Sequence, residues 1–255
     1  MNCIFIGDVV GNSGCLCLEK KLPLLKKKYN ADFVCVNGEN SSKPNGISKE
    51  SAQRIFSAGA DVITTGNHVW FKHEMTEYLD ECEFIIRPAN YPEGTPGKSY
   101  CIFDMGKYSV AVINLLGCVY MESLASPFET ADKILKEIEG QAKYIFVDFH
   151  AEATSEKIAL GYYLDGRVSG VFGTHTHVQT ADLRILEKGT AYITDLGMTG
   201  VENSVLGVKT EIVLKKFLTK RPVTFVQEEG EGKVHGVFVE TDNNGKAIKT
   251  ELIEM

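Results

Sequence analysis

Five apolar runs in this chain are each followed at once by side chains that can bind a metal ion. The residues that follow them are Asp8 after "CIFIG", Glu39 and Asn40 in "FVCVNGEN", Asn67 and His68 in "DVITTGNH", Asp148 and His150 in "YIFVDFH", and His175 and His177 in "VSGVFGTHTH". In open α/β sheets, ligands bind beyond the carboxyl ends of the strands. We therefore expect these side chains to gather at one edge of a sheet.

The types of these side chains favour a two-metal site over a single zinc ion. Each residue alone has an ordinary explanation as a cap, a turn residue or a solvated carboxylate. Together, three or four imidazoles, two carboxylates and two carboxamides exceed the four ligands of a tetrahedral zinc. They suit two metal ions about 3.5–4 Å apart that share a carboxylate, and such pairs hydrolyse phosphate esters. Without sulfur ligands, iron, manganese and zinc all fit this set.

The elements that must position these residues alternate between strands and helices. The expected strands are Cys3–Ile6, Asp32–Val36, Asp61–Thr65, Ser99–Asp104, Tyr108–Leu115, Tyr144–His150, Val168–Phe172, Thr224–Gln227, Val234–Glu240 and Ala247–Ile253. The expected helices are Leu16–Tyr29, one from the N-cap Ser48 to Gly59, Lys72–Glu81, Ala131–Gly140 and Glu211–Lys220. This order predicts an α/β fold with a mixed sheet, and no linker divides residues 1–255 into more than one domain. His175 and His177 are two apart, so a continued strand would place both on one face.

Composition narrows the classes of partner. The net charge of −7 argues against a stable nucleic-acid complex or an anionic membrane surface. No run reaches the ~20 apolar residues of a spanning helix, and the N-terminus lacks the pattern of a secretory signal. Seven cysteines, an odd number, indicate reduced thiols in a cytoplasm, with Cys15 and Cys17 packed in the core and not bound to metal.

The quoted motifs resemble the calcineurin-like metallophosphoesterase superfamily, whose blocks read D-x-H, GD, GNH, a lone H and GHxH. Here they read "GDVV", "GENS", "GNHV", "DFHAEAT" and "GTHTH". Val10 stands where the superfamily has the histidine of D-x-H, and Glu39 stands where it has the bridging aspartate. These departures, with "RPANYPEGTPGK" and "TDLGMTG", are similar to the YmdB-like branch, and the resemblance covers the whole chain.

The resemblance implies a four-layer αββα sandwich of the metallophosphoesterase type with mixed sheets. It also implies a cytoplasmic bacterial phosphodiesterase that acts on cyclic nucleotides, notably 2′,3′-cyclic ones, with two transition metal ions per chain, iron first and manganese or zinc as alternatives. One metal would take Asp8, Glu39, Asn40 and His177, and the other Glu39, Asn67, His150 and His175. Water activated between the metals would attack phosphorus.

Other residues receive roles beside the metals. His68 is not needed as a ligand and is expected to protonate the leaving oxygen, although Val69 replaces the acidic residue that often orients it. Asp148 is a candidate acceptor for a ligand imidazole, and Arg87 a candidate phosphate contact. His73 and His235 are expected to be solvated or structural.

Two other functions stay open, as does self-association. A phosphomonoesterase of the nucleotidase type would share the same core chemistry. A regulatory protein that binds nucleotides and uses its metals structurally belongs to another class. Exposed terminal strands would permit a homo-oligomer.

Overall fold

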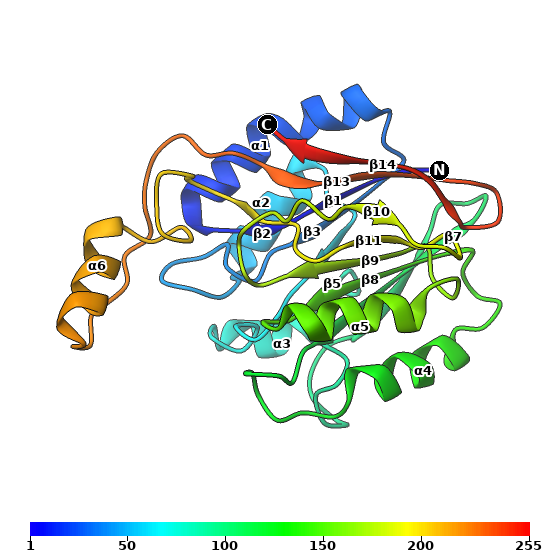
Figure 1. Ribbon diagram of the computed structural model, residues 1–255, viewed down its shortest axis with the longest axis horizontal. Helices are drawn as coiled ribbons and strands as arrows, with labels where there is room; N and C mark the ends of the chain where they lie inside the picture. The colour runs from blue at the N-terminus through cyan, green and yellow to red at the C-terminus, as the bar shows by residue number, and fades with distance from the viewer.

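Two six-stranded sheets lie face to face in the computed structural model, which describes residues 1–255 (Figure 1). The first sheet has the order β14-β13-β1-β3-β4-β5, formed by β14 (Ala247–Glu254), β13 (His235–Thr241), β1 (Asn2–Ile6), β3 (Phe33–Asn37), β4 (Val62–Thr64) and β5 (Ile85–Ile86). The second has the order β10-β11-β9-β8-β7-β6, formed by β10 (Arg184–Ile185), β11 (Ala191–Ile193), β9 (Gly170–Thr174), β8 (Tyr144–His150), β7 (Ser109–Leu116) and β6 (Tyr100–Asp104). Antiparallel strands occupy one edge of the first sheet and both edges of the second, so both sheets are mixed.

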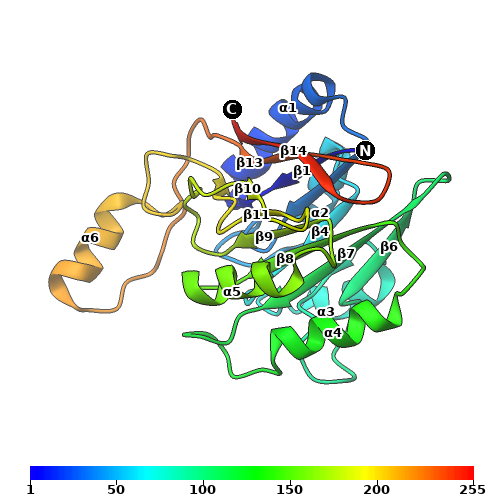
Figure 2. The same cartoon turned by 45° about the vertical axis from the view of Figure 1, so that its right-hand side comes forward.

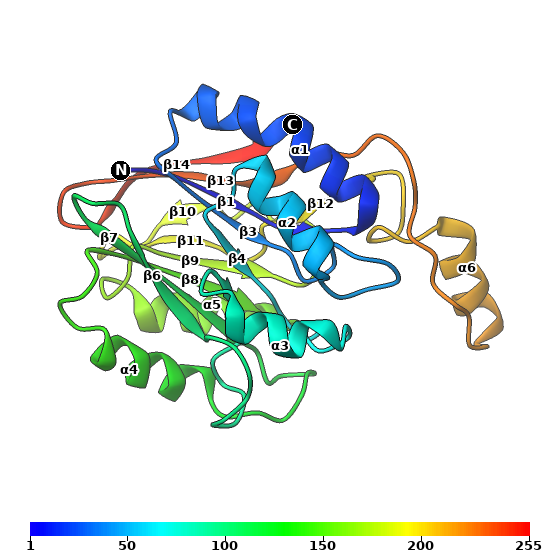
Figure 3. The same cartoon turned by 180° about the vertical axis from the view of Figure 1, so that it is seen from behind.

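Helices cover the outer face of each sheet. Behind the first sheet lie α1 (Gly11–Tyr29), α2 (Lys49–Ala58) and α3 (Glu74–Glu81), as Figure 3 shows. In front of the second lie α4 (Pro127–Glu137) and α5 (Thr154–Leu164) (Figure 1). The predicted four-layer αββα fold is therefore confirmed. A sixth helix, α6 (Thr210–Thr219), belongs to neither layer and stands away from the body in Figures 1 and 2.

Strand alternation divides the apolar residues among three cores. On β1, Ile4 and Ile6 pack under the helices, whereas Cys3 and Phe5 face the second sheet. The residues of β8 alternate in the same way, with Phe146 between the sheets and Val147 and Phe149 under α4 and α5. Because the period is two, Asp148 and His150 share the inner face with Phe146. The strand pattern thus aims these two polar side chains at the other sheet.

Local signals explain some element boundaries and correct others. The Ser48 hydroxyl accepts a hydrogen bond from the Ser51 N–H, and Gly59 ends α2 in a left-handed conformation, as predicted. Helix α4 begins at Pro127, earlier than expected, because Ser126 caps it and proline suits its first turn. Helix α5 was not predicted, since its apolar residues follow no clear helical stripe. The predicted strand Thr224–Gln227 is wrong: only Gln227 makes a β-bridge, to Val208.

All seven cysteines are free thiols, five of them buried. Cys15 and Cys17 belong to α1 and pack in the core. None of the six helices is both long and apolar enough to cross a membrane.

Candidate metal centre

The carboxyl ends of strands from both sheets meet at one side of the molecule. Asp8 lies in the short strand β2 (Asp8–Val9) after β1, and Glu39 and Asn67 follow β3 and β4. His150 ends β8 in the second sheet, and His175 follows β9. The predicted residues therefore do gather. They lie at the carboxyl ends of strands from two facing sheets and not along one side of a single sheet. Neighbouring the cluster, β12 (Met198–Thr199) pairs with β2 in parallel.

Three ligand-type atoms lie close to the Nε2 atom of His150. Its Nε2 lies 3.0 Å from Glu39 Oε1, 3.0 Å from Asn67 Oδ1 and 3.1 Å from His175 Nδ1. Glu39 and His150 are fully buried, and Glu39, His150 and His175 form a group able to hold a metal ion. Oxygen and imidazole nitrogen atoms from four chain segments thus surround a common point.

Asp8, Asn40 and His177 form the other half of the cluster. Asp8 Oδ1 lies 3.8 Å from His177 Nε2, and the Asn40 amide nitrogen lies 3.2 Å from the same imidazole nitrogen. Asp8 Oδ2 accepts a hydrogen bond from the His175 N–H, whereas Oδ1 is buried with no hydrogen-bond partner. An unpaired carboxylate oxygen in the interior is costly unless a cation binds it. The residues present therefore fit a metal ion.

Hydrogen bonds behind two imidazoles select the nitrogen that faces the cluster. His177 Nδ1 donates to the Leu206 carbonyl at 3.1 Å, which leaves the electron pair of Nε2 toward Asp8. The Thr174 hydroxyl donates to Asp148 Oδ1 at 2.7 Å, so it accepts from His150 Nδ1 at 2.9 Å. Such partners orient metal-binding histidines and fix their tautomer. Both rings present Nε2 to the cluster.

Asp148 does not accept a hydrogen bond directly from a candidate imidazole, as the sequence suggested it would. Its carboxylate accepts hydrogen bonds from the Thr64 and Thr174 hydroxyls and from the Asn37 amide. It reaches His150 only through Thr174, and burial raises its pKa. Asp148 therefore links the two sheets through these hydrogen bonds. It also orients the Thr174 hydroxyl that contacts His150.

His175 and His177 do not continue a strand, contrary to the expected geometry. Strand β9 ends at Thr174, and the two histidines adopt positive φ angles of 100° and 64°. This left-handed backbone is unusual for residues with side chains, so surrounding contacts must hold it. The buried ammonium of Lys157 donates to the Thr174 carbonyl at 2.8 Å and to Asp195 Oδ2 at 2.7 Å. Asp195 also accepts from the Thr176 N–H, so this ion pair fixes the turn.

Glu152 was not identified from the sequence. Its carboxylate lies 3.2 Å from His175 Nε2, on the side of the ring away from His150. With Nε2–H donating to Glu152, the electron pair of His175 Nδ1 faces Glu39 and His150. The spacing "HAE" after β8 was the available signal, but nothing in it indicates a contact with a residue 23 positions later.

His68 lies over the cluster in a position that several contacts define. Its Nδ1 lies 2.8 Å from Asn40 Oδ1 and 3.5 Å from Glu39 Oε1, and its backbone N–H donates to Glu39 Oε2. The ring stacks on Phe71, with centroids 4.6 Å apart. Burial lowers the pKa of His68. Asn40 thus takes the orienting position for which the sequence offered no acidic residue.

The cluster carries strongly interacting charges. Burial raises the pKa of Asp8 to about 6. Burial would also raise the pKa of Glu39, but the neighbouring His150 and His68 outweigh it and lower that pKa to about 2. Burial opposes a charge on His150, yet Glu39 and Asp8 raise its pKa to about 9. A cation bound among these carboxylates would displace that proton, because metal binding and protonation compete for the same electron pairs.

Gly66 shows how closely the segments approach. A Cβ atom added there would lie 2.3 Å from Glu39 Oε2 and 2.4 Å from His150 Nε2. No side chain fits between the loop after β4 and these two residues. The glycine of "GNH" is thus required by the cluster itself.

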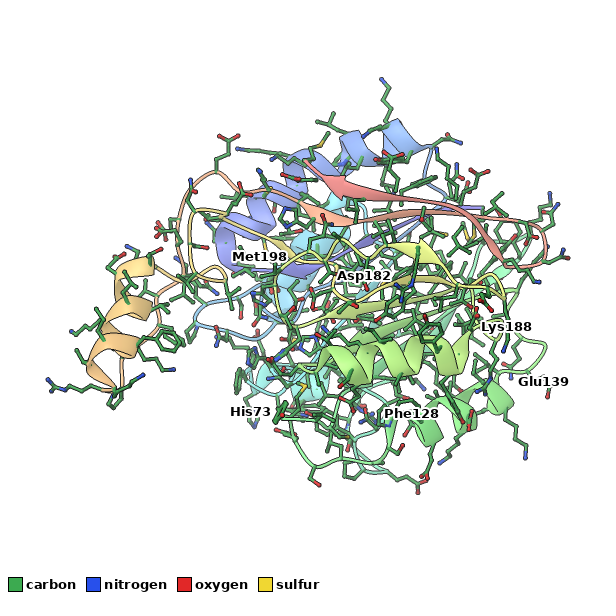
Figure 4. All side chains as sticks on the ribbon, viewed as in Figure 1. His73, Phe128, Glu139, Asp182, Lys188 and Met198 are labelled. Carbon is green, nitrogen blue, oxygen red and sulfur yellow. The ribbon has the colours of Figure 1, made fainter.

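The remaining candidates lie outside this group. The three guanidinium nitrogens of Arg87 donate to the carbonyls of Pro88, Thr95 and Pro96, each at 2.9 Å. Arg87 therefore holds its own loop, and it is buried and does not line the cavity over the cluster. His73 is exposed just before α3, at the periphery of the side chains in Figure 4.

His235 belongs to a second acidic group, but a lysine already neutralises it. Glu202, His235 and Glu254 lie close enough to hold an ion. Lys233 Nζ bridges the two carboxylates at 2.8 and 2.7 Å. This group is a surface ion-pair network.

A cavity of about 420 Å³ opens over this cluster of candidate ligands. Its walls include Glu39, Asn40, His68, His175 and His177. This volume lies within the ~300–1,000 Å³ of typical small-molecule sites. The cluster is thus accessible to a small substrate.

Two facing mixed sheets with this cluster at their strand ends define a protein of the metallophosphoesterase-like fold. An NAD nucleotidase from Haemophilus influenzae shares that fold, with a TM-score of 0.61 and 15% identity over 100% of this chain and 55% of its own. The chain belongs to the family described as YmdB-like protein, which matches residues 4–253. The resemblance inferred from the motifs is thereby confirmed.

Two relatives match over nearly their whole length. The 2′,3′-cyclic-nucleotide 2′-phosphodiesterase of Bacillus subtilis (strain 168) is 48% identical, covering 99% of this chain and 96% of its own. The crystal structure of a phosphatase from Mycoplasma pneumoniae has a TM-score of 0.94 and 36% identity, covering 100% of this chain and 93% of its own.

Proposed function

We propose that this chain is a metal-dependent phosphodiesterase that hydrolyses 2′,3′-cyclic nucleotides. The observation that carries the proposal is the convergence of seven ligand-type side chains, including the buried, unpaired Oδ1 of Asp8, beneath an open cavity. The name of the Bacillus subtilis relative supports the substrate class.

The two halves of the cluster would each hold one metal ion. Asp8, Glu39, Asn40 and His177 would bind the first, and Glu39, Asn67, His150 and His175 the second, with iron as the proposed metal. Glu39 supports the shared role because its Oε1 lies 3.0 Å from His150 Nε2 in one half and 3.1 Å from the Asn40 amide nitrogen in the other. Bound metal ions would acidify water and stabilise negative charge on the phosphoryl oxygens.

Asn40 would serve both the metal and His68. Its amide nitrogen faces Glu39 and His177, and its oxygen faces His68. Metal binding by Asn40 requires the opposite orientation, with the oxygen toward His177. That rotation would turn the NH₂ group toward His68 Nδ1, so the ring would carry its proton on Nε2.

His68 would act as the general acid. Asn40 and the stacked Phe71 hold the ring, and its side chain remains 23% exposed at the cavity. A proton on Nε2 can then pass to the leaving alkoxide when the cyclic diester opens. General acid catalysis of this kind contributes about 10²–10⁴-fold to the rate.

A phosphomonoesterase is the second candidate, because the Mycoplasma pneumoniae structure is named a phosphatase. Rates on 2′,3′-cyclic AMP, bis-p-nitrophenyl phosphate and p-nitrophenyl phosphate separate the two. We expect the cyclic diester to have the highest kcat/KM. Turnover of the monoester alone would contradict the proposed diesterase.

A further inference from the structure

The cavity over the metal cluster has an apolar wall that the chemistry described so far does not use. Besides the candidate ligands, the residues that line it include Val205, Leu206, Val213, Phe217 and Phe225. These residues come from α6 and from the two chain segments that lead into and out of it. One continuous cavity therefore joins a metal-binding end to an apolar, partly aromatic end.

The base of this wall is attached directly to the metal cluster. The Leu206 carbonyl accepts the hydrogen bond from His177 Nδ1. Gly207 packs so closely on Val10 that an added Cβ would lie 2.5 Å from its Cγ1. The two segments also pair with each other, as the Lys209 N–H donates to the Val226 carbonyl at 3.0 Å. The segments that carry the wall are thus anchored beside the candidate ligands.

The aromatic rings of the wall remain accessible. Phe217 is 63% exposed and Phe225 39% exposed, although both are large apolar residues. Lys216 Nζ lies 4.6 Å from the centre of the Phe225 ring and also lines the cavity. A contiguous exposed apolar patch marks an interaction site, and a ligand-binding groove is one kind of such site.

We propose that this wall binds the nucleobase of the substrate, with Phe217 and Phe225 as its stacking surface. The inference rests on the proposed function and adds residues that determine affinity for the nucleoside. The metal end is suited to the cyclic phosphate, and only the apolar end offers area for a planar base. Valine, leucine and phenylalanine provide no hydrogen bonds to base edges. Stacking on these rings therefore selects for the presence of a base and by itself discriminates little among the four bases.

The test compares two substrates that differ only in the base. One is 2′,3′-cyclic AMP, and the other is methyl β-D-ribofuranoside 2′,3′-cyclic phosphate, which carries a methoxy group instead. For Phe225→Ala and Phe217→Ala, the ratio of the two kcat/KM values should fall about 5- to 100-fold, as expected for a lost base–aromatic stack. Leu218→Ala is the matched control, because Leu218 is 82% exposed on the same helix and does not line the cavity. It should keep the wild-type ratio.

Phe225→Leu distinguishes stacking from general packing. It keeps an apolar side chain but removes the ring, so the ratio should still fall. An unchanged ratio in both alanine variants would overturn the proposal. An equal loss on both substrates, accompanied by a lower molecular mass in solution, would also overturn it, by showing that the rings meet a second copy of the chain. If the wild-type protein hydrolyses neither cyclic phosphate, the proposed function itself fails.

Discussion

At the scale of single residues, the site depends on hydrogen bonds that decide which nitrogen of each imidazole faces the cluster of candidate ligands. His68, Asn40 and Glu39 form one such group, and His175 with Glu152 forms another. Neither Asn40 beside His68 nor Glu152 beside His175 could be recognised from sequence spacing. Each brings together segments that lie far apart in the chain.

Replacing His68 with alanine should separate catalysis from metal binding. We expect kcat on 2′,3′-cyclic AMP to fall about 10²–10⁴-fold, because the leaving oxygen loses its proton donor. Metal content, measured by elemental analysis, should not change. His73→Ala is the control, since His73 is exposed and outside the cluster, and it should retain full activity. Full activity of His68→Ala would refute the assignment of the general acid.

Replacing Glu152 should weaken metal binding without removing a ligand. Loss of a carboxylate behind a ligating histidine typically costs about 10- to 100-fold in metal affinity. Competition between Glu152→Ala and a chelator measures this change. The matched control is Glu139→Ala, an exposed glutamate in the turn after α4 that is labelled in Figure 4. Equal affinities for the two variants would show that Glu152 does not orient His175.

At the scale of elements, the turn that carries both histidines depends on a buried ion pair. Lys157 on α5 and Asp195 after β11 have side chains that are only 2% and 0% exposed. Lys157→Met leaves the Asp195 charge unpaired in the interior, which costs about 3–5 kcal/mol of unfolding free energy. Denaturant unfolding followed by circular dichroism measures the loss.

An exposed ion pair provides the comparison. Lys133 and Glu93 lie 3.1 Å apart with side chains 71% and 93% exposed. Such pairs contribute about 0–1 kcal/mol, so Lys133→Met should be nearly neutral. A Lys157→Met protein as stable as Lys133→Met would mean that the buried pair does not hold the turn.

The elements that could be predicted are those with local signals. The Ser48 cap and Gly59 define α2, and continuous apolar runs define β1 and β8. Helix α5 could not be predicted because it presents no clear apolar stripe, with Gly161 packed against Tyr192. The sequence located the strand ends, but the division of strands between two sheets depends on long-range pairing that no short window contains.

The same limit applies to the site. The candidate ligands could be identified because each directly follows an apolar run. The partners that orient the candidate histidines could not be identified in this way. They are Thr174, Glu152 and the Leu206 carbonyl, and their contacts with the imidazoles depend on where the folded chain places them. The positive φ angles of His175 and His177 also arise from tertiary contacts, which explains why strand geometry was the wrong expectation.

At the scale of the whole molecule, the three cores bury most of the thiols. Burial raises the pKa of Cys15 to about 11 and that of Cys101 to about 12, and it also raises the pKa of Cys3, Cys17 and Cys35. Only Cys82 and Cys118 are half-buried. Thiolates react and thiols do not, so a disulfide reagent should modify at most these two quickly in the native protein. All seven should react after unfolding, and rapid reaction of more than two would contradict the packing.

The central claim is that the cluster at the carboxyl ends of the strands holds two metal ions that the reaction needs. Metal-free protein prepared with a chelator, then titrated with ferrous or manganous ions, tests it most directly. We predict that hydrolysis of 2′,3′-cyclic AMP is absent at the start and rises to a plateau at two metal ions per chain. A plateau at one metal ion per chain, or full turnover before any metal is added, would contradict the account.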